Sequence, residues 1–163
     1  MNAPSQFDPN VFLDATTTEV NEKRPPLPTE NPEDPNGLYI AVIGEIKTAT
    51  GTIGKGERVG QPWLQMVVPL RLQLPPSVQG LGFATPEFTL TDRPMIDLTP
   101  QGSIDNAKGK NRAQYNYREA TGTNKPGEAW SWRMLQGKTV KVKVAHEDYQ
   151  GNIVEKVAAI LPA

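Results

Sequence analysis

The chain has 163 residues, enough for one domain with some residues left over for a tail or long loops. Its 16 prolines, 14 glycines and 37% hydrophobic residues favour a small β-rich core joined by long loops over a helical bundle. Because the chain has no cysteine and one histidine, disulfides, thiolate metal sites and sites that need two imidazoles are excluded.

Charge is distributed unevenly along the chain. Residues 1–36 carry seven acids and two bases, a net charge of −5, while residues 37–163 carry eleven acids and fifteen bases, a net charge of +4. An acidic segment attached to a basic body is one reason to consider nucleic acid as a partner. No apolar run is long enough for a membrane span and no signal-peptide pattern opens the chain, so we expect a cytoplasmic protein without membrane contact.

Residues 1–36 are predicted to form an extended or disordered arm. They contain seven of the 16 prolines and few apolar residues, so they cannot bury enough surface to offset the entropy of ordering. Phe7, Val11, Phe12 and Leu13 are the exception, and the alternative is that these residues dock as a short apolar anchor. The folded domain is predicted to cover residues 37–163.

The first element of this domain is a strand. Leu38–Ile46 is β-rich and nearly all apolar, which predicts a central strand, and Gly44 indicates a bulge where the sheet curves. Lys47–Gly60 follows with four glycines, Lys55 and Arg58, and predicts a flexible basic loop. This loop lacks the Gly-Lys-Ser/Thr ending of a phosphate-binding loop.

Pro62–Leu74 shows the clearest alternation, with apolar side chains at every even-numbered position from 64 to 74. Pro69 cannot donate to a ladder, so we expect an edge strand or a bulge at this position. Trp63 and Arg71 fall on the other face, where a ring and a cation suit base stacking. The alternative, equally favoured, is that Trp63 covers a neighbouring loop or a small subcore.

The middle of the chain predicts short strands and a basic loop. Residues 75–86 form a connector, and Glu87–Thr99 predicts two short strands or one strand broken at Pro94. Residues 102–112 are polar and contain three bases, which indicates an exposed basic loop.

A helix is predicted from Asn111 to Ala120, with Gly122 as its C-cap. A second helical turn is predicted between Asn124 and Leu135. Tyr117 shares a helical face with two alanines and is the candidate core residue of the first helix, so Tyr115 would point elsewhere.

The end of the chain predicts a β-hairpin. Valines alternate with threonine and lysines over residues 139–144, which indicates a strand with one buried face and one basic face. Tyr149–Asn152 is a tight-turn signal in which Gly151 takes a positive φ, and Ile153–Leu161 is the second strand.

No catalytic constellation is present, so we expect neither an enzyme nor a metal or organic cofactor. No serine lies in a nucleophile-elbow context. His146-Glu147-Asp148 could hold a divalent cation, but a solvated turn at a strand end explains this cluster better. The spacing of Asp92, Asp97 and Asp105 matches no calcium loop.

The chain does interleave bases with aromatic rings. Single-stranded nucleic acid is bound by such a combination, because cations follow the phosphates while flat rings stack on unpaired bases. Trp63, Tyr115 and Trp132 are the candidate stacking residues. The candidate nucleic-acid-binding residues are Lys55, Arg58, Trp63, Arg71, Lys108, Lys110, Arg112, Tyr115, Arg118, Trp132, Lys141 and Lys143.

About five strands, a helix between the third and fourth, and glycine-rich loops suggest a small Greek-key barrel. Its common version is the five-stranded oligonucleotide-binding (OB) barrel, which binds its ligand on one sheet face and in the adjoining loops. In this interpretation the Gly51–Gly60 loop joins the first two strands, and the Tyr149–Asn152 turn joins the last two.

The segments Leu135–Val144, His146–Asn152 and Ala159–Ala163 resemble the C-terminal pattern of phage-encoded single-stranded-DNA-binding proteins with an OB fold. Gly37–Ile43 is similar to their first strand, and Arg118–Gly122 to the end of their helix. The resemblance implies an OB fold and single-stranded DNA as partner. The chain departs from the pattern in its acidic front arm and in its apolar C-terminal tip, so the arm would have to replace such a tip in recruiting other phage replication proteins.

The leading hypothesis is a phage replication or recombination protein that coats single-stranded DNA in the host cytoplasm without strong sequence preference. Such a protein could also form a homo-oligomer. The alternative is a virion structural or decoration protein whose proline-rich arm lies along a neighbouring subunit. A third hypothesis is a β-barrel adaptor that binds another protein.

Overall fold

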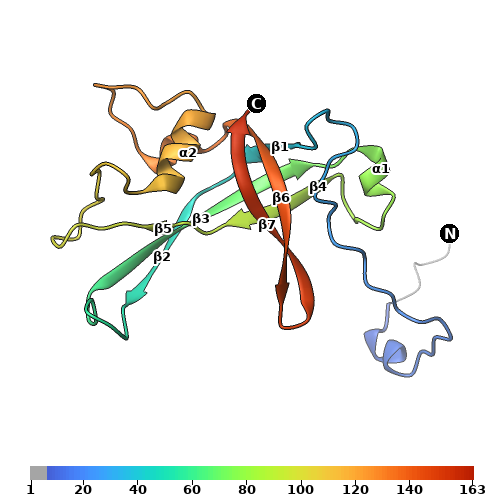
Figure 1. Cartoon of the computed structure of the whole chain (residues 1–163). Coiled ribbons are helices and arrows are strands. Elements are labelled where there is room, and N and C mark those ends of the chain that lie inside the picture. Colours follow the sequence, from blue (N-terminus) through green and yellow to red (C-terminus); the bar gives the residue numbers. More distant parts are fainter. Residues whose placement is uncertain (1–6) are drawn as a thin grey trace.

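The computed structural model describes residues 7–163 as a mainly β protein. Seven strands form one open antiparallel sheet (Figure 1). Five of them follow the hydrogen-bonded order β2-β3-β1-β6-β7, and β4 and β5 also pair with β3. The strands are β1 (Tyr39–Ile43), β2 (Lys47–Thr52), β3 (Pro62–Gln73), β4 (Glu87–Asp92), β5 (Met95–Ile96), β6 (Thr139–Tyr149) and β7 (Asn152–Pro162). The helices are α1 (Pro76–Gln79), α2 (Arg112–Ala120) and the 3-10 helices η1 (Pro9–Leu13) and η2 (Trp132–Leu135).

β3 pairs with other strands along both of its edges, so the prediction of an edge strand at Pro69 is wrong. Pro69 stays in register and pairs with Thr91 of β4. Its carbonyl accepts a hydrogen bond from the backbone N–H of Gly44 at 2.8 Å. Because the N–H and C=O of one strand residue point to the same edge, the N–H that Pro69 lacks would face residues 44–46, the link between β1 and β2. Proline is tolerated there because this edge of the ladder is interrupted.

The same link explains Gly44. A Cβ at this position would lie 3.0 Å from Cγ of Pro69, so glycine permits a close approach. The register also shifts by one residue between the Ile43–Leu70 and Lys47–Val67 pairs, in keeping with the predicted bulge. The chain then enters β2, where a flexible loop was predicted, and β2 pairs with the first half of β3. The glycine-rich loop is therefore limited to residues 53–61.

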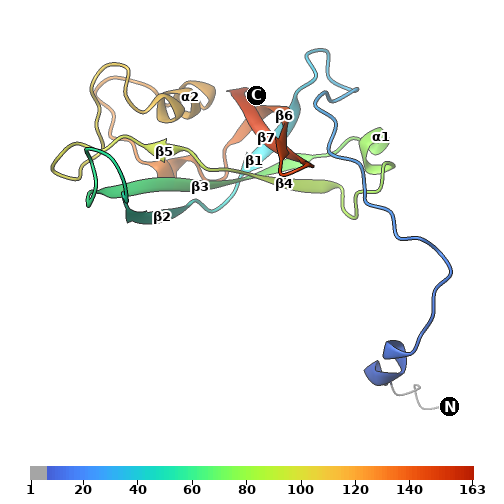
Figure 2. The same ribbon diagram turned by 60° about the horizontal axis from the view of Figure 1, so that its bottom comes forward.

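The core lies on one side of the sheet, here called the inner face, and α2 lies over this side (Figure 2). The alternation predicted for β3 is confirmed, since its even-numbered residues from 66 to 72 are buried. The predicted helix is confirmed as α2, and its Tyr117 is 1% exposed. Of the second helical turn expected between Asn124 and Leu135, only η2 is helical, and it adds Trp132 and Leu135 to the core.

β6 and β7 form the predicted hairpin, with φ of 51° at Gln150 and 82° at Gly151 in the turn. Val140, Val142 and Val144 are buried, as the alternation indicated. The register shifts by one residue after Lys143, and beyond that point the hairpin extends away from the sheet. Its tip and the tip of the β2–β3 hairpin project toward the same side of the molecule (Figure 1).

The N-terminal arm has two parts. Residues 24–36 contain no helix or strand, but they pack on the domain: Leu27 is 0% exposed, and the Tyr39 hydroxyl donates to the Pro28 carbonyl at 2.8 Å. Packing thus begins upstream of residue 37, where the domain was predicted to start. η1 lies apart from the domain at the end of an extended segment (Figure 2), and its apolar residues do not dock within this chain as an anchor.

Candidate nucleic-acid interface

The structure separates the predicted cations and rings into three groups. The first lies on the outer face of the sheet, opposite the inner face, and contains Trp63, Arg71, Lys141 and Lys143. The second lies in the loop of residues 53–61 and contains Lys55 and Arg58. The third lies in α2 and the loop before it and contains Lys108, Lys110, Arg112, Tyr115 and Arg118. The first and third groups face different sides of the sheet.

Trp63 occupies the start of β3, where it is half-buried and pairs with Gly51 of β2. A Cβ at Gly51 would lie 2.7 Å from Cε2, Cζ2 and Nε1 of the Trp63 ring. The ring therefore lies across the Gly51 backbone, and only glycine leaves room for it. Trp63 covers a neighbouring strand without belonging to the hydrophobic core.

Two hollows border the Trp63 side chain. One has a volume of about 410 Å³ and is also lined by Ile53, Gln65 and Met95. The other has a volume of about 380 Å³ and lies between the loop of residues 53–61 and residues 97–102, with Arg58 in its wall. A ring and a cation thus share one hollow, the combination that an unpaired base and its phosphate require.

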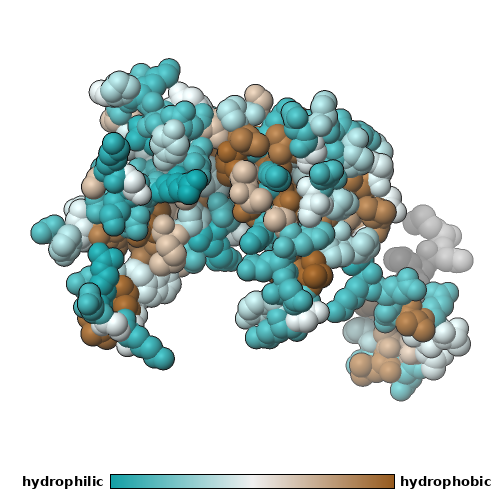
Figure 3. Space-filling model, in the orientation of Figure 1, coloured by the Kyte–Doolittle hydropathy of each residue, from teal (hydrophilic) through white to brown (hydrophobic). Residues whose placement is uncertain are grey.

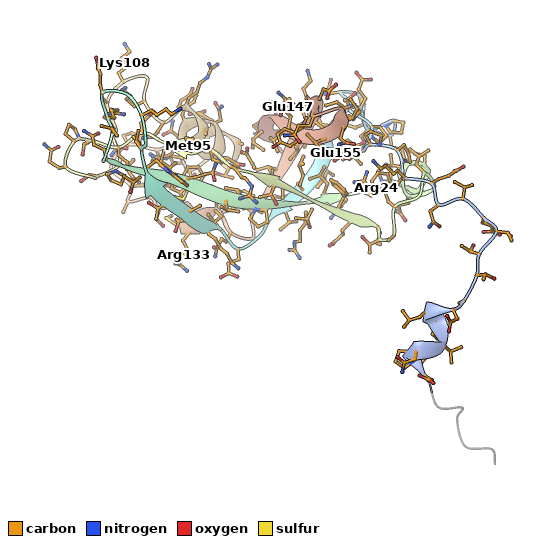
Figure 4. All side chains as sticks on the ribbon, turned by 90° about the horizontal axis from the view of Figure 1, so that it is seen from below. Arg24, Met95, Lys108, Arg133, Glu147 and Glu155 are labelled. Carbon is orange, nitrogen blue, oxygen red and sulfur yellow. The ribbon has the colours of Figure 1, made fainter. Side chains whose placement is uncertain are left out.

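Sequence reasoning did not include three side chains that share the outer face with Trp63. Lys47 pairs with Val67 and Met95 pairs with Gln65, so Lys47, Gln65 and Met95 face outward together with Trp63. Met95 is 54% exposed, and Figure 4 shows it between Lys108, above the sheet in this view, and Arg133, below it. Lys47 was assigned to a loop, and only its pairing with β3 places it on this face.

The basic loop before α2 is fastened by Asn111. Its backbone N–H donates to Oδ2 of Asp97 at 2.8 Å, and its side-chain amide donates to the carbonyls of Asp97 at 3.0 Å and Asp105 at 2.8 Å. Lys108 and Lys110 are exposed within this loop. Because β5 ends at Ile96, next to Leu64, the loop leaves the sheet at the same end as residues 53–61. Two basic loops therefore flank the Trp63 end of the sheet.

The predicted residues of the helical layer differ in accessibility. Tyr115 is 55% exposed, and Arg112 is also exposed. Trp132 is 6% exposed and donates from Nε1 to Oε1 of Gln114 at 3.1 Å. A ring buried to this extent has no face free for a base, so Trp132 no longer belongs to the candidate stacking residues. Arg118 is half-buried, with its guanidinium 5.0 Å from the ring centroid of Trp130.

The arm neutralises part of the basic face of β6. Nζ of Lys141 lies 3.7 Å from Oδ1 of Asp34. Hydrogen bonds from the backbone N–H groups of Leu38 and Asn36, together with Lys141, hold the pKa of the Asp34 carboxyl below its usual value. Lys143 on the same strand is exposed.

Two polar residues that the sequence singled out serve the packing of the domain. The Tyr117 hydroxyl donates to Oδ2 of Asp92 at 2.6 Å, and burial raises the pKa of both groups. His146 donates from Nε2 to the Leu27 carbonyl at 2.6 Å, which ties the hairpin to the arm. Within residues 7–163, no three histidine or acidic side chains are grouped so as to hold a metal ion.

The surface around the hairpins is hollowed. In Figure 3 the β2–β3 and β6–β7 hairpins stand out as separate projections with a recess between them. Tyr149 precedes the β6–β7 turn and is 63% exposed, so this second projection also carries an accessible ring. The sequence pattern predicted Tyr149 to be part of a turn, so it was not among the candidate stacking residues.

Comparison with known proteins assigns no family to the chain. In the part that the structure describes, no helix combines the length and the hydrophobicity needed to cross a lipid bilayer. No family model matches the sequence, and no curated protein is significantly similar to it.

Proposed function

We propose that this protein binds single-stranded DNA without strong sequence preference, and that the outer face around Trp63 is the centre of the interface. The observation that carries the proposal is the position of Trp63, a half-buried ring between two hollows, one of which contains Arg58. A flat ring stacks on any unpaired base and contributes about 1–3 kcal/mol per base. A neighbouring arginine supplies the contact to the phosphate.

The strand connectivity supports an OB-like interpretation. If β1 and β2 count as one bent strand and β4 and β5 as one broken strand, five strands result, with α2 between the third and fourth. β4 also lies beside β7, the pair that would close a barrel. OB folds bind oligonucleotides on the face of strands two and three and at the loops that join the first two and the last two strands. Here these elements are β3 with β4 and β5, residues 53–61 and the β6–β7 turn.

The charge of this part of the chain also supports the proposal. Residues 47–96 contain five bases and three acids, and one of these acids, Asp92, is bonded to Tyr117 on the inner face. Each phosphate that a base neutralises releases counterions, which makes the affinity fall as salt rises. The five bases are Lys47, Lys55, Arg58, Arg71 and Arg93.

Fluorescence anisotropy with a labelled oligo-dT tests the proposal. We expect binding at low salt that weakens steeply between about 50 and 200 mM salt. Trp63→Ala is expected to weaken binding by about 1–3 kcal/mol, and Arg58→Gln to weaken it less and to lower the salt dependence. Absence of binding at low salt, or an affinity that does not change with salt, would contradict the proposal.

Arg112→Gln is the matched control, because it removes the same charge from an exposed position on α2, outside both hollows. We expect it to change the affinity for oligo-dT less than Arg58→Gln does. If the two variants weaken binding equally, the outer face is not the centre of the interface. Thermal unfolding of each variant separates a loss of binding from a loss of folding.

A second candidate function, a virion structural protein with an assembly arm, is favoured by η1. Phe7, Val11, Phe12 and Leu13 are 62–84% exposed at the far end of the arm, where they can reach a neighbouring subunit. Ordered assembly of the full chain without DNA, abolished by removing residues 1–14, would support this candidate. A monomer in sedimentation at high protein concentration would argue against it.

A further inference from the structure

A third hollow, separate from Trp63, lies between α2, η2 and β2. Its volume is about 500 Å³, within the range of sites that hold small molecules. Two tryptophans, Trp130 and Trp132, and two arginines, Arg118 and Arg133, are among its lining residues. We refer to it as the α2 cleft. It is a second candidate site because none of the residues that form the hollows around Trp63 lines it.

Arg118 is the unusual residue of the α2 cleft. Its guanidinium packs on Trp130, and Nη2 donates to the Thr123 carbonyl at 3.3 Å. Its Nε is buried and has no hydrogen-bond partner among residues 7–163, and Arg118 forms no ion pair within this range. A half-buried guanidinium without a counter-anion is unfavourable unless a ligand supplies the missing negative charge.

Other donors surround this charge. Arg133 is exposed on η2 and lines the same cleft. Glu128 is the single acidic residue in the wall of the cleft. Gln114 and Gln136 use their side-chain oxygens to accept hydrogen bonds from Trp132 Nε1 and from the Ile46 N–H. Their amide NH₂ groups form no hydrogen bond among residues 7–163 and remain available as donors. The wall therefore combines two cations and several donors with one carboxylate.

From this geometry we propose that the α2 cleft binds a nucleotide through its 5′ phosphate. Arg118 and Arg133 contact the phosphate, since guanidinium groups match phosphate oxygens in charge and in hydrogen-bond geometry. The cleft is far larger than a phosphate needs, and the half-buried ring of Trp130 in its wall offers an apolar surface for the base. The ligand is either a free mononucleotide or the 5′-phosphorylated end of a strand. The proposal is independent of the Trp63 interface, which uses other residues.

The three tryptophans of the chain provide the measurement. Trp63→Phe leaves Trp130 and Trp132, which both line the α2 cleft, so the fluorescence of this variant reports on the cleft. In this background we expect saturable quenching by dTMP, with thymidine and inorganic phosphate each binding at least about tenfold more weakly. Equal binding of thymidine and dTMP would overturn the role of the phosphate. Equal binding of inorganic phosphate and dTMP would overturn the role of the base.

Variants locate the site. Arg133→Gln changes an exposed residue and is expected to weaken dTMP binding about tenfold or more. Arg118→Lys keeps the charge but removes Nε, and is expected to weaken binding as well, whereas Arg112→Gln, outside the cleft, is the control and leaves binding unchanged. No saturable quenching, or equal effects of Arg133→Gln and Arg112→Gln, would overturn the proposal.

A final comparison identifies the source of the nucleotide. A short oligo-dT with a 5′ phosphate is titrated beside the same oligonucleotide without it, in the Trp63→Phe background. Stronger quenching by the phosphorylated oligonucleotide, lost in Arg133→Gln, supports a strand end as ligand. Quenching by dTMP with no effect of the 5′ phosphate on the oligonucleotide supports a free nucleotide. If neither dTMP nor the phosphorylated oligonucleotide quenches, no nucleotide binds in the cleft.

Discussion

The two described ends of the N-terminal arm differ in a way that hydrophobicity does not explain. Residues 7–13 contain four large apolar side chains, yet these are 62–84% exposed. Residues 24–36 contain one large apolar side chain, Leu27, and it is 0% exposed. The less apolar end of the arm is the one that docks.

The difference lies in the polar groups of the backbone. The Leu27 N–H donates to Oε1 of Glu155 at 2.9 Å, and the Leu27 carbonyl accepts from His146 Nε2 at 2.6 Å. Arg24 completes the contact, since its guanidinium lies 3.0 Å from Glu155 and 4.7 Å from the ring centroid of Phe83 (Figure 4). A buried segment without strand partners needs its N–H and C=O groups satisfied by side chains. Among residues 7–36, the side chains of β6–β7 satisfy the backbone groups of Leu27.

The largest effect is expected for the residue that docks. Leu27→Ala should lower the free energy of unfolding by about 2–5 kcal/mol, because the leucine is fully buried and leaves a cavity. Leu13→Ala, the matched change at the exposed end, should alter it by less than about 0.5 kcal/mol. Urea unfolding of both variants measures the contrast. A loss below 1 kcal/mol for Leu27→Ala would mean that residues 24–28 do not stabilise the domain.

Glu155→Ala should be the next largest change. It leaves the buried N–H of Leu27 without an acceptor, which costs about 1–3 kcal/mol. The ion pair with Arg24 adds little, since the arginine side chain is 38% exposed. Arg24→Gln is the control that removes the ion pair alone, and in the same urea experiment it should cost less than Glu155→Ala.

The contribution of Glu155 should depend on pH. Burial alone would raise its pKa, but hydrogen bonds from the Leu27 N–H and from Arg24 outweigh burial and lower the pKa of the folded protein below the usual 4.5. The added stability is therefore fully present above pH 4.5 and is lost as the pH falls through the lower, folded value. The difference in unfolding free energy between wild type and Glu155→Ala should shrink in acid, and a difference that grows in acid would reverse the assigned sign.

Tyr39→Phe should have a smaller effect. Burial raises the pKa of Tyr39 to about 12, so its hydroxyl is protonated at neutral pH and donates to the Pro28 carbonyl. Loss of this one hydrogen bond should cost about 0.5–1.5 kcal/mol. Calorimetry at neutral pH measures the change, and a variant as stable as wild type would show that this bond does not help to hold the arm.

The smallest effect is expected from removing residues 1–14. Because η1 does not contact the domain, the truncated protein should unfold within about 0.5 kcal/mol of the full chain. Thermal unfolding checks this expectation at low protein concentration, where association between copies does not contribute. A clear loss of stability would show that both ends of the arm support the fold.

Local patterns in the sequence predicted much of the fold. Alternation identified the buried faces of β3 and β6, and the glycine turn identified the β6–β7 hairpin, because these signals depend on neighbouring residues. The strand positions of Pro69 and Lys47 were predicted wrongly because they depend on residues that are distant in the sequence. Whether a proline is tolerated, or a lysine belongs to a strand, depends on a partner segment some 20 residues away, which local periodicity does not contain.

The candidate site was predicted less completely. The sequence identified Trp63 and Arg58 as components, but it also proposed Trp132, which helical packing against Gln114 and Tyr117 buries. The sequence-based prediction also assigned the basic residues near α2 and the basic residues of the strands to one surface. Sequence spacing does not show whether a residue lies in the helical layer or on the outer face of the sheet. The docking of Leu27 was missed because its partner Glu155 lies 128 residues further along the chain.

That separation has a consequence for the order of events during synthesis. The arm leaves the ribosome well before the hairpin that supplies Glu155 and His146. Residues 24–28 cannot dock until the β6–β7 hairpin has emerged, and their docking then joins residues that are 128 positions apart in the sequence. Nascent chains without β7 should therefore carry an arm that proteases cut readily, whereas emergence of the complete β6–β7 hairpin makes Arg24–Pro28 resistant.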